Sequence, residues 1–209
     1  MGEWEKRALR APGHLHTPVS RSPFTNQSML KKILIGLTVI VAGVIAAAFV
    51  KSPDYRVERS LVIAAPVEKI FTMFDNHRKF NEWNPWAKMD PEAKNTYSGP
   101  ESGVGAVASW EGDKVGKGSA TITESKPNER IVERMDWLKP MEGVSTVEFT
   151  FKPEGDGKTK VTWAMYGKNE GLLTRVVSLF MDCESMCGPE FEKGLADVAK
   201  LVTTPTATP

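Results

Sequence analysis

The stretch that decides the fold is residues 147–165, VEFTFKPEGDGKTKVTWAM. Apolar and polar residues alternate in both halves of this stretch, which is the pattern of strands that bury one face. Its centre, residues 154–157, reads Glu-Gly-Asp-Gly, a composition typical of a hairpin turn. The stretch therefore predicts two antiparallel strands with a shared apolar face, and it leaves Thr150 and Thr162 on the solvated face.

More strands of the same kind are expected before this hairpin. Short alternating runs recur there, each with one apolar face, and glycine-containing turns separate them. The apolar faces are Val57, Leu61 and Ile63; Val104, Ala106, Ala108 and Trp110; Ala120 and Ile122; and Ile131, Met135 and Trp137. Because no helix alternates with the later runs, we expect a first strand over residues 55–64 and then a six-strand antiparallel meander.

A short helix is expected between the first strand and the meander. Pro66 suits the first turn of a helix, and Val67, Ile70, Phe71 and Phe74 follow at spacings of three and four. The stretch after this helix, which contains three large aromatic residues, is expected to be a linker.

A long helix is expected at the end of the domain, from about Gly171 to Val202. Gly188-Pro189 should interrupt it, because proline cannot donate a backbone hydrogen bond. These elements predict an α+β domain in which a curved antiparallel sheet wraps around the long C-terminal helix. A ligand would lie between the sheet and that helix.

One segment before the domain has the length and composition of a membrane span. Residues 33–50, ILIGLTVIVAGVIAAAFV, carry no charge, and as a helix they would extend for about 27 Å. Lys31 and Lys32 precede the segment, so we expect a cytoplasmic N-terminus and an exported domain. The alternative is a secretory signal that is cleaved near Ala46-Ala47-Ala48.

The expected organisation has four parts. Residues 1–28 are a disordered leader or an upstream extension of the reading frame, and residues 29–51 are a transmembrane anchor or an uncleaved signal. Residues 52–202 form a single domain, and residues 203–209 form a disordered tail of Thr, Pro and Ala.

A set of short motifs runs through the domain in a fixed order. The motifs are Val57-Glu58-Arg59-Ser60, Ile63-Ala64-Ala65-Pro66, Trp83-Asn84-Pro85-Trp86, Ser98-Gly99-Pro100, Gly103-Val104-Gly105, Gly116-Lys117-Gly118, Glu129-Arg130-Ile131, Val161-Thr162-Trp163 and Phe191-Glu192-Lys193-Gly194-Leu195. In this order they resemble the START-like SRPBCC superfamily, most closely its polyketide cyclase/dehydrase-like branch. The resemblance implies a helix-grip fold with a deep pocket for hydrophobic ligands. It does not imply one activity, because its members include lipid carriers, cyclases and chaperone cofactors.

Glu133 is the most unusual residue on the expected inner face of the sheet. Strand parity places it beside Ile131 and Met135, where burial would raise its pKa and suit it to acid or base chemistry, or to holding a ligand hydroxyl group. Arg59 has the same parity on the first strand, so it is a candidate partner of Glu133 or a clamp for a ligand carboxylate. The alternative is that a bulge or a sheet edge turns either side chain to solvent.

The remaining candidates line the expected pocket, although core packing would explain each of them as well. They are Trp110, Ile122, Met135, Trp137, Phe149, Trp163, Met165, Leu179 and Met186, with Glu133 and Arg59 as polar anchors.

The composition argues against several classes of partner and site. The chain has 27 Lys+Arg against 26 Asp+Glu and no basic run beyond Lys31-Lys32, so nucleic acid is not an expected partner. His77 is the only histidine of the domain, so neither a metal site nor a cofactor is expected. Cys183 and Cys187, four apart on the expected helix, are interpreted as core thiols, with a strained bridge or a metal site as alternatives.

The expected function is membrane-anchored binding of a hydrophobic small molecule or lipid, with no assigned catalytic residue. Two alternatives remain open at this point. One is an enzyme of cyclase, dehydrase or isomerase type that uses Glu133 as acid or base. The other is a protein-interaction module whose pocket has collapsed.

Overall fold

The computed structural model describes residues 24–204, which form a long helix followed by an α+β domain. The predicted leader up to residue 23 and the predicted tail from residue 205 lie outside the described residues. The chain divides into two units, one ending at Ala42 and one beginning at Gly43, and each is described by itself.

The long helix α1 spans Phe24–Val50. It starts before residue 29, so the last part of the expected leader is helical. From Gln27 to Val50 it is long and apolar enough to cross a membrane, and it is the only such helix in the described part of the chain. Most of its large apolar side chains are exposed, as lipid-facing side chains would be.

Seven antiparallel strands form one sheet, in the order β1-β7-β6-β5-β4-β3-β2. They are β1 (Asp54–Ile63), β2 (Lys94–Ser98), β3 (Val107–Gly112), β4 (Gly116–Lys126), β5 (Arg130–Lys139), β6 (Gly143–Pro153) and β7 (Thr159–Lys168). The first strand and the meander are therefore confirmed, and residues 154–157 form the turn between β6 and β7 as predicted. No alternating run marked the position of β2 in the sequence, because its residues KNTYS are polar and mostly exposed at the sheet edge.

Three short helices follow β1, where one helix and a linker were expected. They are α2 (Val67–Phe71), α3 (His77–Trp83) and α4 (Pro85–Met89). Asn76 caps α3 by accepting hydrogen bonds from the backbone N–H groups of Arg78 and Lys79. Asn84 caps α4 in the same way through Trp86 N. Each asparagine satisfies donors that a helix start leaves unpaired, which is why the supposed linker folds into helices.

The C-terminal helix is broken at a different place from the one predicted. α5 spans Leu172–Val177 and α6 spans Cys183–Thr203, so the break lies between them and not at Pro189, which lies inside α6. Pro189 removes only one backbone donor from α6. The other twenty residues of the helix, and its packed face, are enough to keep it continuous. The side-chain hydroxyl of Ser178 donates to Arg175 O at the end of α5, a local bond that competes with helix continuation.

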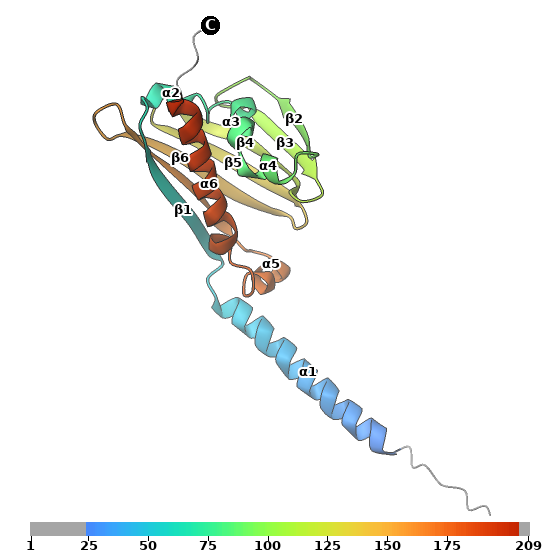
Figure 1. Cartoon of the computed structure of the whole chain (residues 1–209). Helices are drawn as coiled ribbons and strands as arrows, with labels where there is room; N and C mark the ends of the chain where they lie inside the picture. Colours follow the sequence, from blue (N-terminus) through green and yellow to red (C-terminus); the bar gives the residue numbers. More distant parts are fainter. Residues whose placement is uncertain (1–23, 205–209) are drawn as a thin grey trace, which may run out of the picture. The chain divides into compact units, whose positions relative to one another are not determined.

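Figure 1 shows α6 lying across one face of the curved sheet, with α3 and α4 beside it on the same face. The core forms where these helices meet the sheet. Its largest fully buried side chains come from α3, the α2–α3 connection, β6 and α6: Trp83, Phe74, Phe149 and Phe191. The inner face of the sheet therefore contacts helices along much of its length, and the outer face carries the polar half of each strand.

Candidate functional site

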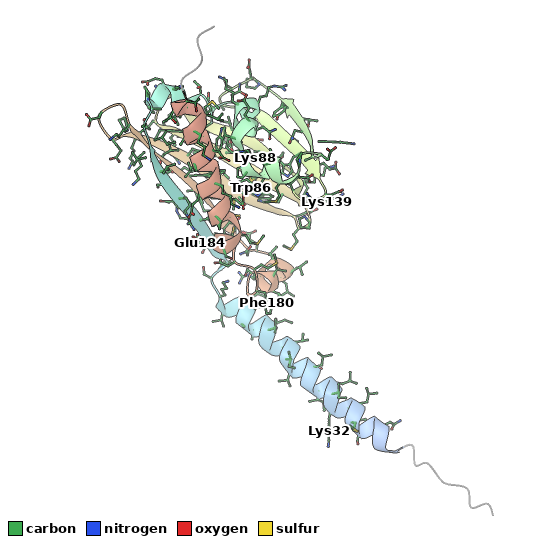
Figure 2. The ribbon with its side chains drawn as sticks, viewed as in Figure 1. Lys32, Trp86, Lys88, Lys139, Phe180 and Glu184 are labelled. Atoms are coloured by element: carbon green, nitrogen blue, oxygen red, sulfur yellow. The ribbon has the colours of Figure 1, made fainter. Side chains whose placement is uncertain are left out.

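Aromatic rings fill the part of the inner face that lies under α3 and α4. The ring of Trp163 on β7 stacks on Phe191 of α6, with 4.2 Å between centroids and 9° between planes. Phe149 lies 5.3 Å from Trp163 and 5.0 Å from Phe74. Trp86 of α4, labelled in Figure 2, adds an edge-on contact to Trp163 at 5.8 Å. We call this set the aromatic core, and in it protein side chains occupy the space where the resemblance implies a deep pocket.

Several predicted pocket residues belong to this core or pack against it. Ile122, Phe149, Trp163 and Met165 are buried among protein side chains. Met186, by contrast, is exposed over 55% of its surface on α6. These residues contribute to the core or to the outside of α6. The remaining candidates lie elsewhere on the sheet, except Leu179, which lies between α5 and α6.

The other end of the inner face carries half-buried aromatic and thioether side chains. They are Tyr55, Trp110, Met135 and Trp137, on β1, β3 and β5, and we call them the aromatic floor. The rings of Trp110 and Trp137 meet edge to face at 5.7 Å. These side chains keep part of their surface accessible, whereas the aromatic core is buried except for the half-buried Trp86.

Two glycines explain why the rings of the aromatic floor lie against the sheet. A Cβ atom on Gly118 would come within 2.5 Å of the Trp110 ring, and one on Gly167 would come within 2.6 Å of the Tyr55 hydroxyl oxygen. Both distances are far below van der Waals contact, so any side chain at these positions would lift the ring from the sheet. The glycines thus allow a flat apolar surface in place of upright side chains.

A short chain of hydrogen bonds crosses the aromatic floor. Trp137 Nε1 donates to Ser145 Oγ at 2.7 Å, and the Tyr55 hydroxyl group shares a hydrogen bond with the same oxygen at 2.7 Å. Ser145 is almost fully buried, so it anchors both rings to β6. Burial raises the pKa of Tyr55, which keeps its hydroxyl group protonated. The result is an apolar surface with one fixed polar group.

Residues of α5 and α6 lie near this end of the sheet. Cys183 and Cys187 in the first turns of α6 are half-buried, free thiols whose sulfur atoms are 3.8 Å apart. Negative charge on either sulfur atom would raise the pKa of Tyr55, because both lie near its hydroxyl group. Leu179, another predicted lining residue, is half-buried just before α6.

Arg59 is not the partner of Glu133, which corrects one of the sequence hypotheses. Its guanidinium group binds Glu184 and Glu192 of α6, each at 2.6 Å. Gly188 of α6 leaves room for the guanidinium, since a Cβ atom there would overlap it. Arg59 on β1 therefore holds α6 against β1 through these two carboxylates.

Glu133 points into the protein, as strand parity predicts, and only 3% of its surface is exposed. Its strand neighbours are Ile122 on β4 and Val147 on β6, both buried. The register shift in this region lies on β4 between Ile122 and Glu124, so it leaves the orientation of Glu133 unchanged. Burial, and then the nearby Asp75, raise the pKa of Glu133 to about 8.

His77, the first residue of α3, faces Glu133. Its Nδ1 atom lies 3.6 Å from Oε1 of Glu133, and its Nε2 atom contacts Ala106 O at 3.3 Å. Burial lowers the pKa of His77, so both groups are neutral near pH 7 and the contact is not an ion pair. Oε1 of Glu133 has no hydrogen-bond partner among the described residues.

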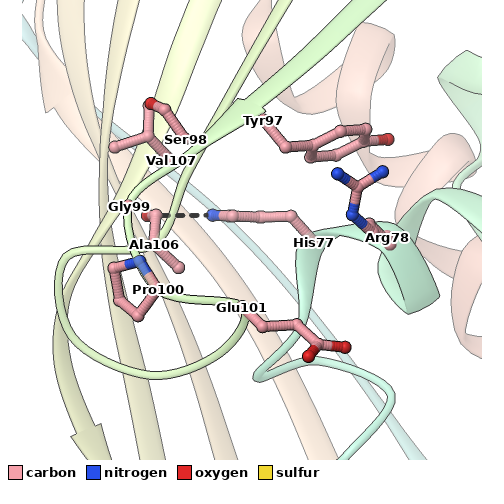
Figure 3. A pocket seen from close by; sticks show the side chains of 9 residues that line it. All are labelled: His77, Arg78, Tyr97, Ser98, Gly99, Pro100, Glu101, Ala106 and Val107. Carbon is pink, nitrogen blue, oxygen red and sulfur yellow. Dashed lines mark hydrogen bonds between the residues drawn. The ribbon is translucent and has the colours of Figure 1, made fainter.

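A cavity of about 300 Å³ opens beside His77. Figure 3 shows the imidazole reaching Ala106 and the Tyr97 ring lying against the guanidinium of Arg78, whose Cζ is 4.4 Å from the ring centroid. Glu101 lies at the other side of this cavity. The cavity is therefore polar and carries both charges, unlike the aromatic floor. A second cavity of about 440 Å³ lies between α4 and α6 and is lined by charged residues such as Lys88 and Asp197, which pair with each other.

Sequence reasoning missed three of these residues: His77, Tyr55 and Ser145. His77 and Glu133 are far apart in sequence, so no spacing motif could connect them. Ser145 has the inward parity of Val147 and could have been noticed as a polar residue on an apolar face. Within residues 24–204, no group of three or more His, Cys, Asp or Glu side chains is placed to hold a metal ion.

Comparison with solved structures identifies the same fold in several proteins. A protein from Chromobacterium violaceum is 18% identical over 73% of this chain and 99% of its own, with a TM-score of 0.52. A norcoclaurine synthase point mutant from Thalictrum flavum, in complex with a transition-state analogue, is 14% identical over 73% of this chain and 96% of its own, with a TM-score of 0.53. A major latex-like protein from Panax ginseng is 10% identical over 73% and 99%, with a TM-score of 0.51.

At these identities the likeness shows the fold alone. No curated protein matches the sequence. A family model does match, over residues 64–178, which cover most of the sheet and the three short helices. Its description is "Activator of Hsp90 ATPase homolog 1-like protein". With the helix-grip arrangement of sheet and α6, this match means that the chain belongs to the AHSA1 family and has an SRPBCC/START-like domain.

Proposed function

We propose that this protein is a membrane-anchored carrier or receptor that binds a hydrophobic small molecule or lipid on its aromatic floor. The observation that carries the proposal is the surface made by Tyr55, Trp110 and Trp137. All three rings remain partly accessible, and those of Tyr55 and Trp110 lie against Gly167 and Gly118. Sites for small apolar ligands combine such surfaces with a few fixed polar groups. Ser145, with the Tyr55 hydroxyl group, supplies that polar group here.

The fold family supports the same role. The norcoclaurine synthase of this fold is described with a bound transition-state analogue, so a helix-grip domain can hold a small organic molecule. In the present protein the aromatic core occupies part of the inner face, which leaves the aromatic floor as the apolar surface with accessible rings. The ligand we propose is therefore small or elongated, and it contacts the floor instead of filling the whole grip.

Membrane anchorage through residues 33–50 is part of the proposal. The end of α1 and the residue that follows it contact the domain, which favours retention of α1 over cleavage. Ala48 is 1% exposed, and the Lys51 ammonium group donates to Ser178 O. Cleavage near Ala46-Ala47-Ala48 would remove or loosen these contacts. Intact-mass measurement of the protein from the membrane fraction tests this point, because cleavage would remove the mass of α1.

Ligand binding is tested by mass spectrometry of small molecules that co-purify with the full chain, isolated from its host in lipid nanodiscs. A lipid or other apolar molecule at a stoichiometric amount is expected, and Trp137→Ala should reduce it. Tyr166→Ala is the matched control, because Tyr166 is a half-buried aromatic residue of opposite strand parity on β7. No enrichment over empty nanodiscs would contradict ligand binding. It would favour a protein-interaction module, the kind of role that the family description names for the Hsp90 ATPase activator.

A second candidate function rests on Glu133. A buried carboxyl group with a pKa of about 8 and an unpaired oxygen beside His77 is suited to proton transfer. This carboxyl group favours an enzyme of cyclase, dehydrase or isomerase type, which is the kind of activity named in the polyketide cyclase/dehydrase-like branch. Once a ligand is known, Glu133→Gln should abolish its turnover and leave its binding intact. Unchanged turnover would exclude this role.

A further inference from the structure

The connection between β7 and α6 exposes a group of large apolar side chains. After α5, a tight turn continues to Met181 through backbone hydrogen bonds from Phe180 and Met181 to Val177 O. Leu172, Leu173, Phe180 and Met181 are exposed over 49%, 65%, 76% and 53% of their surfaces. Figure 2 labels Phe180 on this connection. We call these four residues the α5 apolar face.

This connection contacts the residues at which α1 ends. The Lys51 ammonium group donates to Ser178 O at 2.5 Å, and the Arg175 guanidinium lies 5.2 Å from the centre of the Phe49 ring. All of these residues belong to the unit that begins at Gly43. Residues 172–181 are therefore held beside the last turn of α1.

The end of a membrane-spanning helix lies at the level of the lipid headgroups. The uncharged run of α1 stops at Val50 and Lys51 follows it, so Phe49 and Lys51 would lie at that level in a bilayer. A segment in contact with them lies at the same level. Leucine, phenylalanine and methionine side chains gain free energy by leaving water for the acyl chains there, and Lys51 and Arg175 suit anionic headgroups.

We propose that the α5 apolar face inserts into the boundary between the headgroups and the acyl chains of the bilayer that α1 spans. The occupant is lipid, because the connection that carries this face contacts the end of an apolar helix and two basic side chains, Lys51 and Arg175, accompany it. This inference rests on the membrane anchorage proposed above and does not depend on ligand binding. It gives the domain a second attachment to the membrane next to α5.

Lipid-exposed positions can be found with a fluorescent label and spin-labelled lipids. The full chain carries the substitutions Cys183→Ser and Cys187→Ser and one new cysteine, introduced as Leu172→Cys, Phe180→Cys, Leu201→Cys or Val41→Cys. Each variant is labelled with an environment-sensitive fluorophore and reconstituted into phosphatidylcholine/phosphatidylglycerol vesicles. Leu201 is the matched control, because it is a leucine of similar exposure, 47%, about 27 Å along α6 from Cys183. Val41 reports on α1.

Labels at 172 and 180 should lose most of their fluorescence to lipids that carry a spin label near the headgroup. The label at 41, in the middle of the apolar run, should lose its fluorescence to lipids that carry the spin label deep in the acyl chain, whereas the label at 201 should lose none to either lipid. Quenching at 41 without quenching at 172 and 180 would overturn the inference and leave anchorage intact. Absence of quenching at all four positions would overturn anchorage and the inference together. Protection of 172 and 180 from aqueous iodide, without quenching by lipid, would mean that protein of the same chain or of a second copy covers these positions, and it would also overturn the inference.

A second measurement keeps the natural cysteines, in case their replacement unfolds the domain. A photo-crosslinking amino acid replaces Leu172 or Leu201 in the full chain, and irradiated vesicles are analysed by mass spectrometry. Lipid adducts are expected at 172 and not at 201. Absence of adducts at 172, in protein that forms adducts when position 41 carries the crosslinker, would contradict the inference.

Discussion

The imidazole of His77 and the carboxyl group of Glu133 face each other inside the domain, with 3.6 Å between Nδ1 and Oε1. Only 6% of His77 and 3% of Glu133 is exposed. Because burial disfavours charge on both, the pKa of Glu133 is raised and that of His77 is lowered. A neutral acid therefore meets a neutral imidazole, and the pair makes the stability of the domain depend on pH.

The free energy of unfolding should fall between pH 6.5 and pH 8. Folded Glu133 keeps its proton up to about pH 8, whereas in the unfolded chain it loses the proton near its ordinary value of 4.5. Its contribution to stability is therefore present at low pH and is lost as pH rises toward 8. His77 acts in the opposite direction, but only below its ordinary value of 6.5. Above pH 6.5 the expected loss from Glu133 is about 2 kcal/mol over the interval.

Urea unfolding of wild type and Glu133→Gln at several pH values measures this loss. The variant should lack the slope between pH 6.5 and pH 8, because glutamine does not titrate. Glu92→Gln, at an exposed position, is the control and should keep the slope. Equal slopes in wild type and Glu133→Gln would mean that Glu133 is ionised in the folded protein at pH 7.

Two glycines of α6 should respond differently to alanine. A Cβ atom on Gly194 would come within 2.9 Å of the Trp163 ring and 3.3 Å of Trp83, and these packed rings cannot move away. We expect Gly194→Ala to destabilise the domain by about 1–3 kcal/mol. At Gly188 the obstacle is the flexible end of Arg59, so Gly188→Ala should change stability little. Thermal unfolding measures the melting temperature of each variant. Equal melting temperatures for Gly194→Ala and Gly188→Ala would contradict the packing argument.

Asn76 should contribute to stability as the cap of α3. Its side-chain oxygen accepts from Arg78 N at 2.9 Å and from Lys79 N at 3.2 Å. Removing a cap of this kind typically costs about 0.5–2 kcal/mol, and we expect that loss in Asn76→Ala. Asn95→Ala, at an exposed position on β2, should cost less. Urea titrations of both variants give their free energies of unfolding. Equal losses of stability in Asn76→Ala and Asn95→Ala would argue against capping by Asn76.

The hydroxyl group of Ser145 should contribute to the stability of the domain and to the position of the Trp137 ring. Ser145→Ala leaves Trp137 Nε1 and the Tyr55 hydroxyl group without their common partner in a half-buried place. We expect a loss of about 1–3 kcal/mol and a red shift of the tryptophan emission as Trp137 gains access to water. Ser60→Ala, which removes an exposed hydrogen bond to Thr162, should do neither. An unchanged emission spectrum in Ser145→Ala would mean that the hydrogen bond does not hold the Trp137 ring.

The sequence alone determined the parts of this protein that depend on local pattern. Alternation along β1 and along β3 to β7 and the inward side of Glu133 follow from a side-chain period of two, and the turn at residues 154–157 follows from its glycines. The apolar run of α1 follows from composition. The two asparagine caps of α3 and α4 were also local signals, although their helices are too short to show a clear apolar period.

Only the tertiary structure decided which side chains meet. Strand parity places Arg59 and Glu133 on the same face of the sheet, but it does not say that α6 brings Glu184 and Glu192 to Arg59 or that α3 brings His77 to Glu133. It also does not say that aromatic rings close one end of the inner face and lie flat on glycines at the other. These contacts join residues far apart in the chain, and they depend on how helices pack on the sheet, which no local pattern of residues records.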